Sequence, residues 1–285
     1  MAKNRRQLKS NAYQLAALDR DFILGDSTRG VRFMLEYAKA EEHLRAWGIA
    51  STVVVFGSAR IMPGGSRDPA AATAPLPPRA APRPGHKSAW WYEQARQFGR
   101  IVSERGGALT PKDGKRHNVI ATGGGPGVME AANRGAMEAG APSIGFNIGL
   151  PMEQEPNAYS TPDLTFRFHY FAMRKMHLAV RAAALVVFPG GFGTFDELFE
   201  ILTLRQTGKM PVVPILCLDP SYWKKVVDFE AMAEEGMIAP ADLELFGFAE
   251  DAEEAWQALL ARGLQVPSIS NRKTSRPSVD KARSP

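Results

Sequence analysis

The feature that most constrains the fold is the alternation of short apolar runs with helical patterns between residues 51 and 262. Runs such as STVVVF at 51–56 and ALVVF at 184–188 contain no alternating polar residues, as expected for strands buried on both faces. The helical stretches between them are long enough to serve as parallel crossovers. We therefore predict an α/β fold: a doubly wound, Rossmann-like parallel sheet with helices on both faces, plus an N-terminal helical extension.

The expected elements divide the chain into a helical extension, a catalytic domain and a tail. Residues 1–50 form the extension, clearest from Val31 to Trp47, which is expected to cover the core or a partner subunit. Residues 51–262 form a Rossmann-like nucleotide-binding domain with a flexible Pro- and Ala-rich insert at 61–88, and 263–285 a disordered basic tail. Strands are expected at 51–56, 118–122, 143–148, 164–168, 184–188 and 212–218, and helices at 89–105, 128–139, 171–183, 195–207, 221–235 and 251–262.

Composition and charge exclude several classes of protein. The single cysteine, Cys217, rules out a disulfide framework, and residues 1–10 lack the apolar segment of a signal peptide, so we expect a cytoplasmic protein with no membrane span. The net charge is +5, but four basic residues lie in 1–10 and five, against one aspartate, in 263–285. The body between them is mildly acidic, which argues against a nucleic-acid groove in the core.

The most informative motif is the glycine-rich turn from Pro189 to Thr194, which follows the strand ALVVF and precedes the helical stretch FDELFEILTL. Glycines let the backbone approach a ligand closely, and the unpaired N–H groups of a helix start attract anions such as phosphate. The turn is not a Walker loop, because no Gly-Lys-Ser or Gly-Lys-Thr follows, and it lacks the dinucleotide fingerprint. ATP hydrolysis and NAD redox chemistry are therefore disfavoured.

Glu197 has two interpretations at this stage. Thr194 and Glu197 have the spacing of a capping box, in which each side chain satisfies a free backbone N–H group. Alternatively, a glutamate one turn into a phosphate-binding helix lies a few ångströms beyond the phosphate, where the C1′ atom of a ribose would be. The second interpretation makes Glu197 catalytic.

Two further segments suggest ligand contact. Gly123, Gly124 and Gly125 follow a predicted strand, and three consecutive glycines exceed what a tight turn needs. Arg174 and Lys175 lie near the start of a predicted helix, where cations oppose the helix dipole, so they require a negative partner unless they form a solvated pair.

The histidines, in contrast, do not suggest a metal site. His169 and His177 have no metal-binding spacing and are expected to be packing residues.

Two of these motifs together resemble a known family. Residues 189–197 fit PGGxGTxxE, and Met173-Arg174-Lys175 fits the Arg-Lys pair that accompanies it in the LONELY GUY family of cytokinin-activating phosphoribohydrolases. The resemblance covers about residues 51–235, and segments 123–130 and 145–154 are similar to the family's longer bacterial branch. Such proteins are often labelled "lysine decarboxylase", although nothing in this sequence resembles a pyridoxal-phosphate lysine motif.

The resemblance implies a hydrolase that cleaves the N-glycosidic bond of nucleoside 5′-monophosphates, cytokinin riboside monophosphate, AMP or both, to free base and ribose 5-phosphate. It implies that Arg174 and Glu197 are catalytic, that no metal or redox cofactor is required, and that the protein is a homo-oligomer. The implied substrate-binding residues are Ser58, Gly124, Gly125, Glu153, Lys175, Gly190, Gly191, Phe192, Gly193, Thr194, Asp196 and Thr203. A dedicated AMP nucleosidase and a non-catalytic nucleotide-binding module remain as alternatives.

Overall fold

The computed structural model describes residues 4–64, 87–149 and 155–267. Its centre is a seven-stranded sheet of order β4-β3-β2-β1-β5-β6-β7, in which every neighbouring pair is parallel. The strands are β1 (Thr52–Phe56), β2 (Val119–Thr122), β3 (Ser143–Ile148), β4 (Thr165–Phe168), β5 (Ala182–Val187), β6 (Ile215–Leu218) and β7 (Gly247–Ala249). The predicted doubly wound α/β fold is confirmed.

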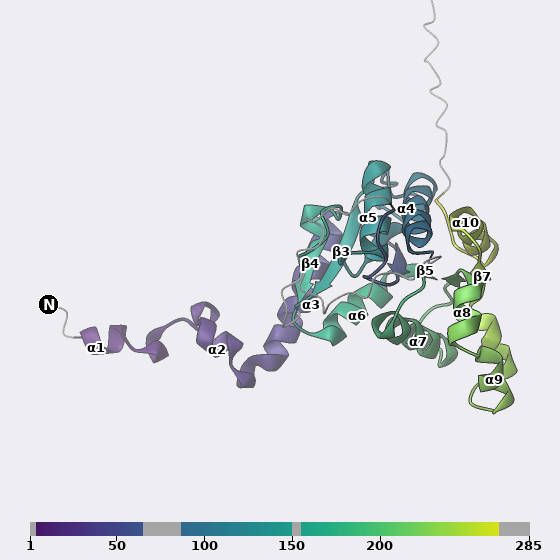
Figure 1. Cartoon of the computed structure of the whole chain (residues 1–285). Coiled ribbons are helices and arrows are strands. Elements are labelled where there is room, and N and C mark those ends of the chain that lie inside the picture. Colours follow the sequence, from purple (N-terminus) through teal and green to yellow (C-terminus); the bar gives the residue numbers. More distant parts are fainter. Residues whose placement is uncertain (1–3, 65–86, 150–154, 268–285) are drawn as a thin grey trace, which may run out of the picture.

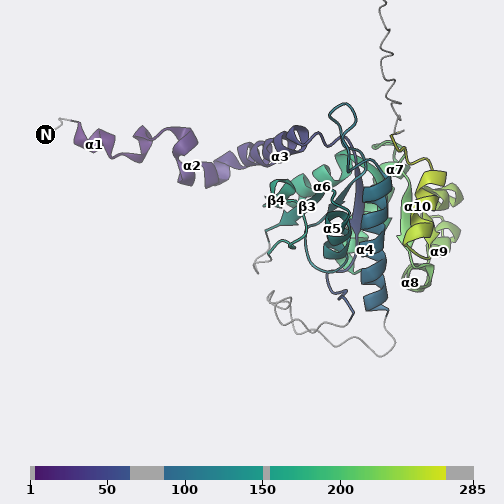
Figure 2. The ribbon, with the colours of Figure 1, turned by 90° about the horizontal axis from the view of Figure 1, so that it is seen from above.

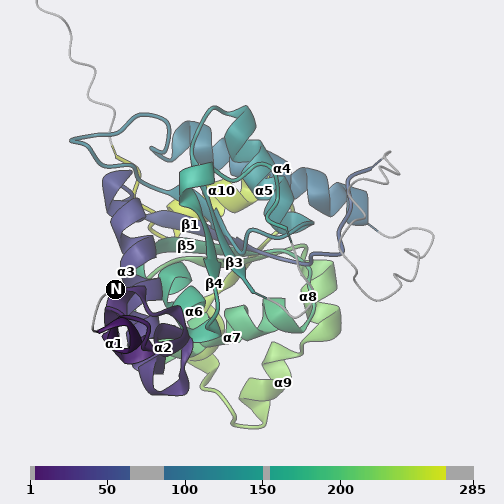
Figure 3. The ribbon, with the colours of Figure 1, turned by 90° about the vertical axis from the view of Figure 1, so that its left-hand side faces the viewer.

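Helices cover both faces of the sheet (Figure 3). One face carries α4 (Ser88–Arg105), α5 (Val128–Glu138) and α10 (Ala252–Ala261). The other carries α3 (Arg29–Ala46), α6 (Phe171–Val180), α7 (Phe192–Gln206), α8 (Pro220–Val226) and α9 (Phe229–Glu234). Alternate residues of β1 enter the two cores: Val53 and Val55 pack with the first layer, and Val54 and Phe56 with the second. Burial on both faces explains why the strands are continuously apolar.

The winding order determines where a ligand can bind. The chain starts the sheet at β1, moves outward through β2 and β3 to β4, and then returns to place β5 on the other side of β1. The direction of winding reverses between β1 and β5, and parallel sheets bind ligands in the crevice beyond the carboxyl ends of strands at such a point. The loops that leave these two strands are joined there, because the Ser58 N–H donates to the Pro189 carbonyl at 3.1 Å.

The N-terminal helices only partly cover the core. The segment with α1 (Arg5–Leu8), α2 (Arg20–Leu24) and the first half of α3 projects away from the body (Figures 1 and 2). The second half of α3 packs against the sheet through Ala40 and Leu44. None of the helices in the described ranges is both long and apolar enough to cross a membrane. Short 3₁₀ turns occupy Asn11–Tyr13, Ala16–Leu18, Asp26–Thr28, Pro162–Leu164 and Pro240–Leu245.

Several predicted boundaries differ from the structure. The predicted helix 221–235 is two helices, because the Asp228 carboxylate accepts from the Ala231 N–H at 2.9 Å and starts α9 anew. The predicted strand 212–218 is shortened to β6, since Pro214 has no N–H for a sheet bond. The strand β7 was missed. Of the predicted insert and tail, 65–86 and 268–285 lie outside the described residues.

The crossing of α4 and α5 depends on Gly135, where an added methyl group would overlap the carbonyl oxygen of Arg96. Gly135→Ala is therefore expected to lower the free energy of unfolding by about 1–3 kcal/mol, measured by urea denaturation. Gly30→Ala is the matched control, because Gly30 lies in α3 with no atom near its added methyl. Gly30→Ala should leave the free energy of unfolding unchanged or raise it by up to about 1 kcal/mol relative to the parent protein. Equal unfolding midpoints for Gly135→Ala and the parent protein would contradict the close packing.

Candidate active site

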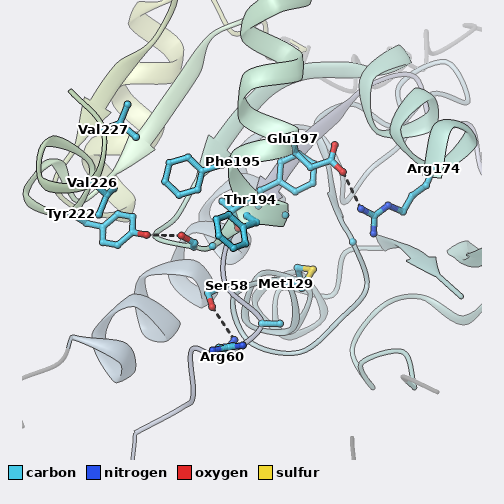
Figure 4. Close-up of a pocket in the computed structure, with 18 residues that line it drawn as sticks. Ser58, Arg60, Met129, Arg174, Thr194, Phe195, Glu197, Tyr222, Val226 and Val227 are labelled. Atoms are coloured by element: carbon cyan, nitrogen blue, oxygen red, sulfur yellow. Dashed lines mark hydrogen bonds and ion pairs between the residues drawn. The ribbon is translucent and has the colours of Figure 1, made fainter. Parts of the chain in front are cut away.

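A cavity of about 950 Å³ opens beyond the carboxyl ends of β1 and β5 (Figure 4). Its walls are the loop after β1, the Gly123 turn after β2, the side chains of Met129 and Arg174, the turn before α7, the first turns of α7, and α8. All of these segments are brought together by the reversal of winding between β1 and β5. The cavity therefore lies where the glycine-rich turns predicted a ligand.

The turn between β5 and α7 presents free backbone N–H groups. Within the described residues, the N–H groups of Gly191, Phe192 and Gly193 have no hydrogen-bond partner, whereas those of Thr194 and Phe195 donate to the Gly191 carbonyl at 2.9 and 3.0 Å. No side chain in the described part of the chain caps this helix. Free N–H groups at the positive end of a 15-residue helix form a favourable environment for an anion.

Glu197 does not take part in a capping box, so that interpretation was wrong. The helix α7 begins at Phe192 rather than at residue 195, which places Thr194 inside the first turn instead of at the cap. Glu197 is instead 3% exposed, and Arg174 donates from Nη2 to its Oε1 at 3.0 Å (Figure 4). The result is a buried ion pair in the wall of the cavity.

Burial and positive charge act in opposite directions on Glu197. Burial raises the pKa of its carboxyl, and the neighbouring Arg174 and Lys175 lower it by less, so the net pKa lies above the ordinary value of a glutamate. A carboxyl with a raised pKa is suited to proton transfer, because its protonated and ionised forms are closer in free energy near neutral pH.

The Arg174 guanidinium also lies 5.2 Å from the centre of the Phe171 ring.

Lys175 pairs with two acidic side chains of α7, Asp196 at 2.8 Å and Glu200 at 3.2 Å. Burial alone would lower the pKa of Lys175, but these two pairs outweigh it and raise the pKa. The requirement of Arg174 and Lys175 for negative partners is therefore met by carboxylates of α7, and the alternative of a solvated pair was wrong. Lys175 and Asp196 line a shallower depression of about 500 Å³ beside the main cavity.

Comparisons with known proteins show which sequences the chain is similar to. A sequence profile of the family described as "Possible lysine decarboxylase" matches residues 129–259. The chain is 27% identical over 150 residues to the cytokinin riboside 5′-monophosphate phosphoribohydrolase LOG5 of Arabidopsis thaliana, a match that covers 52% of this chain and 64% of that protein. It is 33% identical over 92 residues to the cytokinin riboside 5′-monophosphate phosphoribohydrolase of Rhodococcoides fascians, covering 32% of this chain and 46% of that protein. The predicted resemblance to the LONELY GUY family is confirmed.

Each of these matches spans less than two thirds of the relative's length. Among solved structures, the chain is similar to a molybdenum cofactor binding protein from Rippkaea orientalis. That similarity has 19% identity and a TM-score of 0.43, and it covers 74% of this chain and 96% of the other.

The residues predicted from the LONELY GUY resemblance fall into four groups. Those that line the main cavity are Ser58, Arg174, Gly190, Gly191, Phe192, Gly193, Thr194 and Glu197. Lys175, Asp196 and Thr203 line the neighbouring depression. Gly124 and Gly125 line neither the cavity nor the depression. Their backbone groups form hydrogen bonds within the protein: the Gly124 N–H donates to Thr122 Oγ1 at 2.9 Å, and the Gly125 carbonyl accepts from Asn157 Nδ2 at 3.1 Å. Glu153 lies outside the described residues.

Some residues that line the cavity were not predicted. Arg60 lies two positions after Ser58 in the same turn and could have been included with it. Tyr222, Val226 and Val227 reach the cavity through the packing of α8, for which the sequence contains no local signal. Met129, at the start of α5, lies in the segment 123–130 that is similar to the family's bacterial branch, but the sequence assigns it no role.

The two histidines differ from each other. His177 is buried as predicted and stacks on Tyr37 with ring centres 5.3 Å apart. His169 is exposed, so its prediction as a packing residue was wrong. Within the ranges that the structure describes, no group of three or more His, Cys, Asp or Glu side chains is placed to hold a metal ion.

Arg174→Met is expected to raise the pKa of the Glu197 carboxyl further, because the arginine's positive charge is removed while burial remains. The carboxyl would then lose its proton at a higher pH than in the parent protein. A ¹³C-NMR titration of side-chain-labelled glutamate, with the signal assigned by its loss in Glu197→Gln, measures the change. Arg105→Met removes an arginine from an exposed pair with Glu253 and should leave this pKa unchanged. An equal or lower pKa in Arg174→Met would contradict the electrostatic account.

Proposed function

We propose that this protein hydrolyses the N-glycosidic bond of nucleoside 5′-monophosphates, giving a free base and ribose 5-phosphate. The observation that carries the proposal is that a buried Glu197–Arg174 ion pair and the free N–H groups at the start of α7 line one cavity. The names of the curated relatives support a cytokinin riboside 5′-monophosphate as substrate. AMP is the second candidate substrate, and a dedicated AMP nucleosidase would cleave it in preference.

The phosphate of the substrate would bind at the turn before α7. Free N–H groups, the helix dipole and the buried Thr194 hydroxyl all favour an anion there. Glu197 lies three residues beyond Thr194 on the same helix, and one turn of an α-helix rises about 5.4 Å. This separation suits a ribose that extends from the phosphate so that C1′ approaches the Glu197 carboxylate.

In the proposed reaction, the bond between C1′ and the base nitrogen breaks and its electron pair stays with the base. Positive charge develops on the sugar, and an ionised Glu197 beside it stabilises that charge or receives a proton from the attacking water. Water supplies the new hydroxyl group on C1′, and one proton is delivered to the departing base. Arg174 would orient the Glu197 carboxylate and favour its ionised form through their hydrogen bond, against the effect of burial.

The organisation of the whole protein is part of the same proposal. We assign residues 51–262 to the catalytic domain and residues 1–50 to a helical extension, in a cytoplasmic homo-oligomer. The exposed apolar side chains of the N-terminal segment, among them Leu15, Leu18 and Met34, support a role in assembly.

Glu197→Gln is expected to lower turnover of AMP or isopentenyladenosine monophosphate by on the order of 10²- to 10⁴-fold, because the amide can neither carry negative charge nor accept the proton. Binding of the nucleotide should largely persist. Chromatographic detection of the free base measures turnover. Glu41→Gln is the matched control, since Glu41 is also a buried glutamate paired with an arginine, Arg181, but lies outside the cavity. If Glu197→Gln cleaved the nucleotide as fast as the parent protein, Glu197 would have no catalytic role.

The parent protein is also expected to cleave AMP at least about 100-fold more efficiently than adenosine, in kcat/KM. The reason is that adenosine lacks the anion for which the turn before α7 provides charge-assisted hydrogen bonds, each worth about 1.5–3 kcal/mol. Parallel assays of base release from the two compounds give the ratio. Similar efficiency for both would show that the turn does not bind phosphate. Nucleotide binding without release of base from either monophosphate would instead favour a non-catalytic binding module.

A further inference from the structure

Tyr222 makes a hydrogen bond that no sequence motif predicted. Its hydroxyl group, on α8, donates to the carbonyl oxygen of Gly190 at 2.5 Å (Figure 4). Gly190 belongs to the turn before α7, and Tyr222 lines the same cavity as that turn. The bond therefore joins α8 directly to the segment that offers free N–H groups.

This bond determines which way one peptide group of the turn points. In a trans peptide the C=O and N–H groups point in opposite directions, so a Gly190 carbonyl directed at Tyr222 directs the Gly191 N–H away from it. The Gly191 N–H is one of the N–H groups that lack a partner among the described residues. If this peptide flipped, a carbonyl oxygen would replace that N–H and would repel an anion.

We propose that Tyr222 is a positioning residue for the anionic group of the substrate, acting through the Gly190–Gly191 peptide. This inference rests on the proposed function. Tyr222 fixes the orientation in which the turn donates hydrogen bonds to phosphate, and takes no part in cleavage of the glycosidic bond. It therefore contributes to the preference for a nucleotide over a nucleoside.

The position of Tyr222 is set independently of any ligand. The N-cap residue that precedes α8, Asp219, is 1% exposed and has a left-handed backbone with φ of 66°. Its carboxylate accepts from Trp91 Nε1 at 2.8 Å and from Lys87 Nζ at 3.2 Å. The Tyr222 ring packs edge-on against the rings of Trp91 and Trp223. These contacts remain when only the hydroxyl is removed, so Tyr222→Phe should fold normally.

The test compares Tyr222→Phe with the parent protein, using the full chain. Calorimetric titration with inorganic phosphate and with AMP is expected to show about 10- to 100-fold weaker binding, the equivalent of one charge-assisted hydrogen bond. KM for AMP should rise in proportion, while kcat changes by less than about threefold. The kcat/KM for adenosine should stay unchanged, because adenosine has no phosphate. Tyr92→Phe, which removes a hydroxyl bonded to Glu130 at 2.7 Å, is the control and should match the parent protein.

The outcomes separate this inference from the function on which it rests. If the parent protein binds neither phosphate nor AMP, the anion site itself is wrong and the role of Tyr222 fails with it. If the parent protein binds and cleaves AMP but Tyr222→Phe equals it in phosphate affinity, only the role of Tyr222 is wrong. An equal loss of activity towards AMP and adenosine would also overturn that role, since it would show a general effect on the site.

Discussion

The structure depends on the parallel pairing of β1 with β5 at the centre of the sheet. Phe56 pairs with Val187, and the next residues continue the contact through the bond from the Ser58 N–H to the Pro189 carbonyl. The start of α5 joins the same junction, because the Val128 N–H donates to the Ser58 carbonyl at 3.2 Å. Segments far apart in the sequence are thus held within hydrogen-bonding distance, and without this register the turn before α7 and the loop after β1 would not share a cavity.

Two buried glutamates paired with arginines show how the environment distinguishes a structural carboxylate from a candidate catalytic one. The hydrogen bond from Arg181, together with that from Arg45, outweighs the opposing effect of burial and lowers the pKa of Glu41 to about 2, so Glu41 stays ionised and joins α3 to the body. For Glu197, burial outweighs the effect of Arg174 and the pKa rises. Where arginines fully offset the cost of burying a carboxylate, the ion pair favours stability. Where they offset it only in part, the carboxyl can still change its protonation state.

The sequence was sufficient to predict the fold class and the turn before α7, because both follow from local patterns: apolar runs of strand length, and glycines between a strand and a helix. Predictions from the sequence failed where a residue's surroundings are set by contacts with distant segments of the chain. The capping interpretation assumed that α7 starts at residue 195, but its start at Phe192 buries Glu197 against Arg174 of another helix. Gly124 suggested a ligand, yet its N–H is used by Thr122 within the protein. The role of Tyr222 depends on α8 packing beside the turn, which no local pattern encodes.

The arrangement of charge also explains why a phosphate and an ionised glutamate could occupy one small site. A dianion bound at the start of α7 would lie about one helical turn from Glu197, and its negative charge would raise the pKa of that carboxyl beyond the effect of burial. Arg174 and Lys175 lie near Glu197 and oppose this rise. Lys175 is shared with Asp196 and Glu200, so its positive charge is partly neutralised before a ligand arrives. Arg174 therefore supplies most of the positive charge that offsets the phosphate, which accounts physically for its place beside Glu197, the only carboxylate among the described residues that lines the cavity.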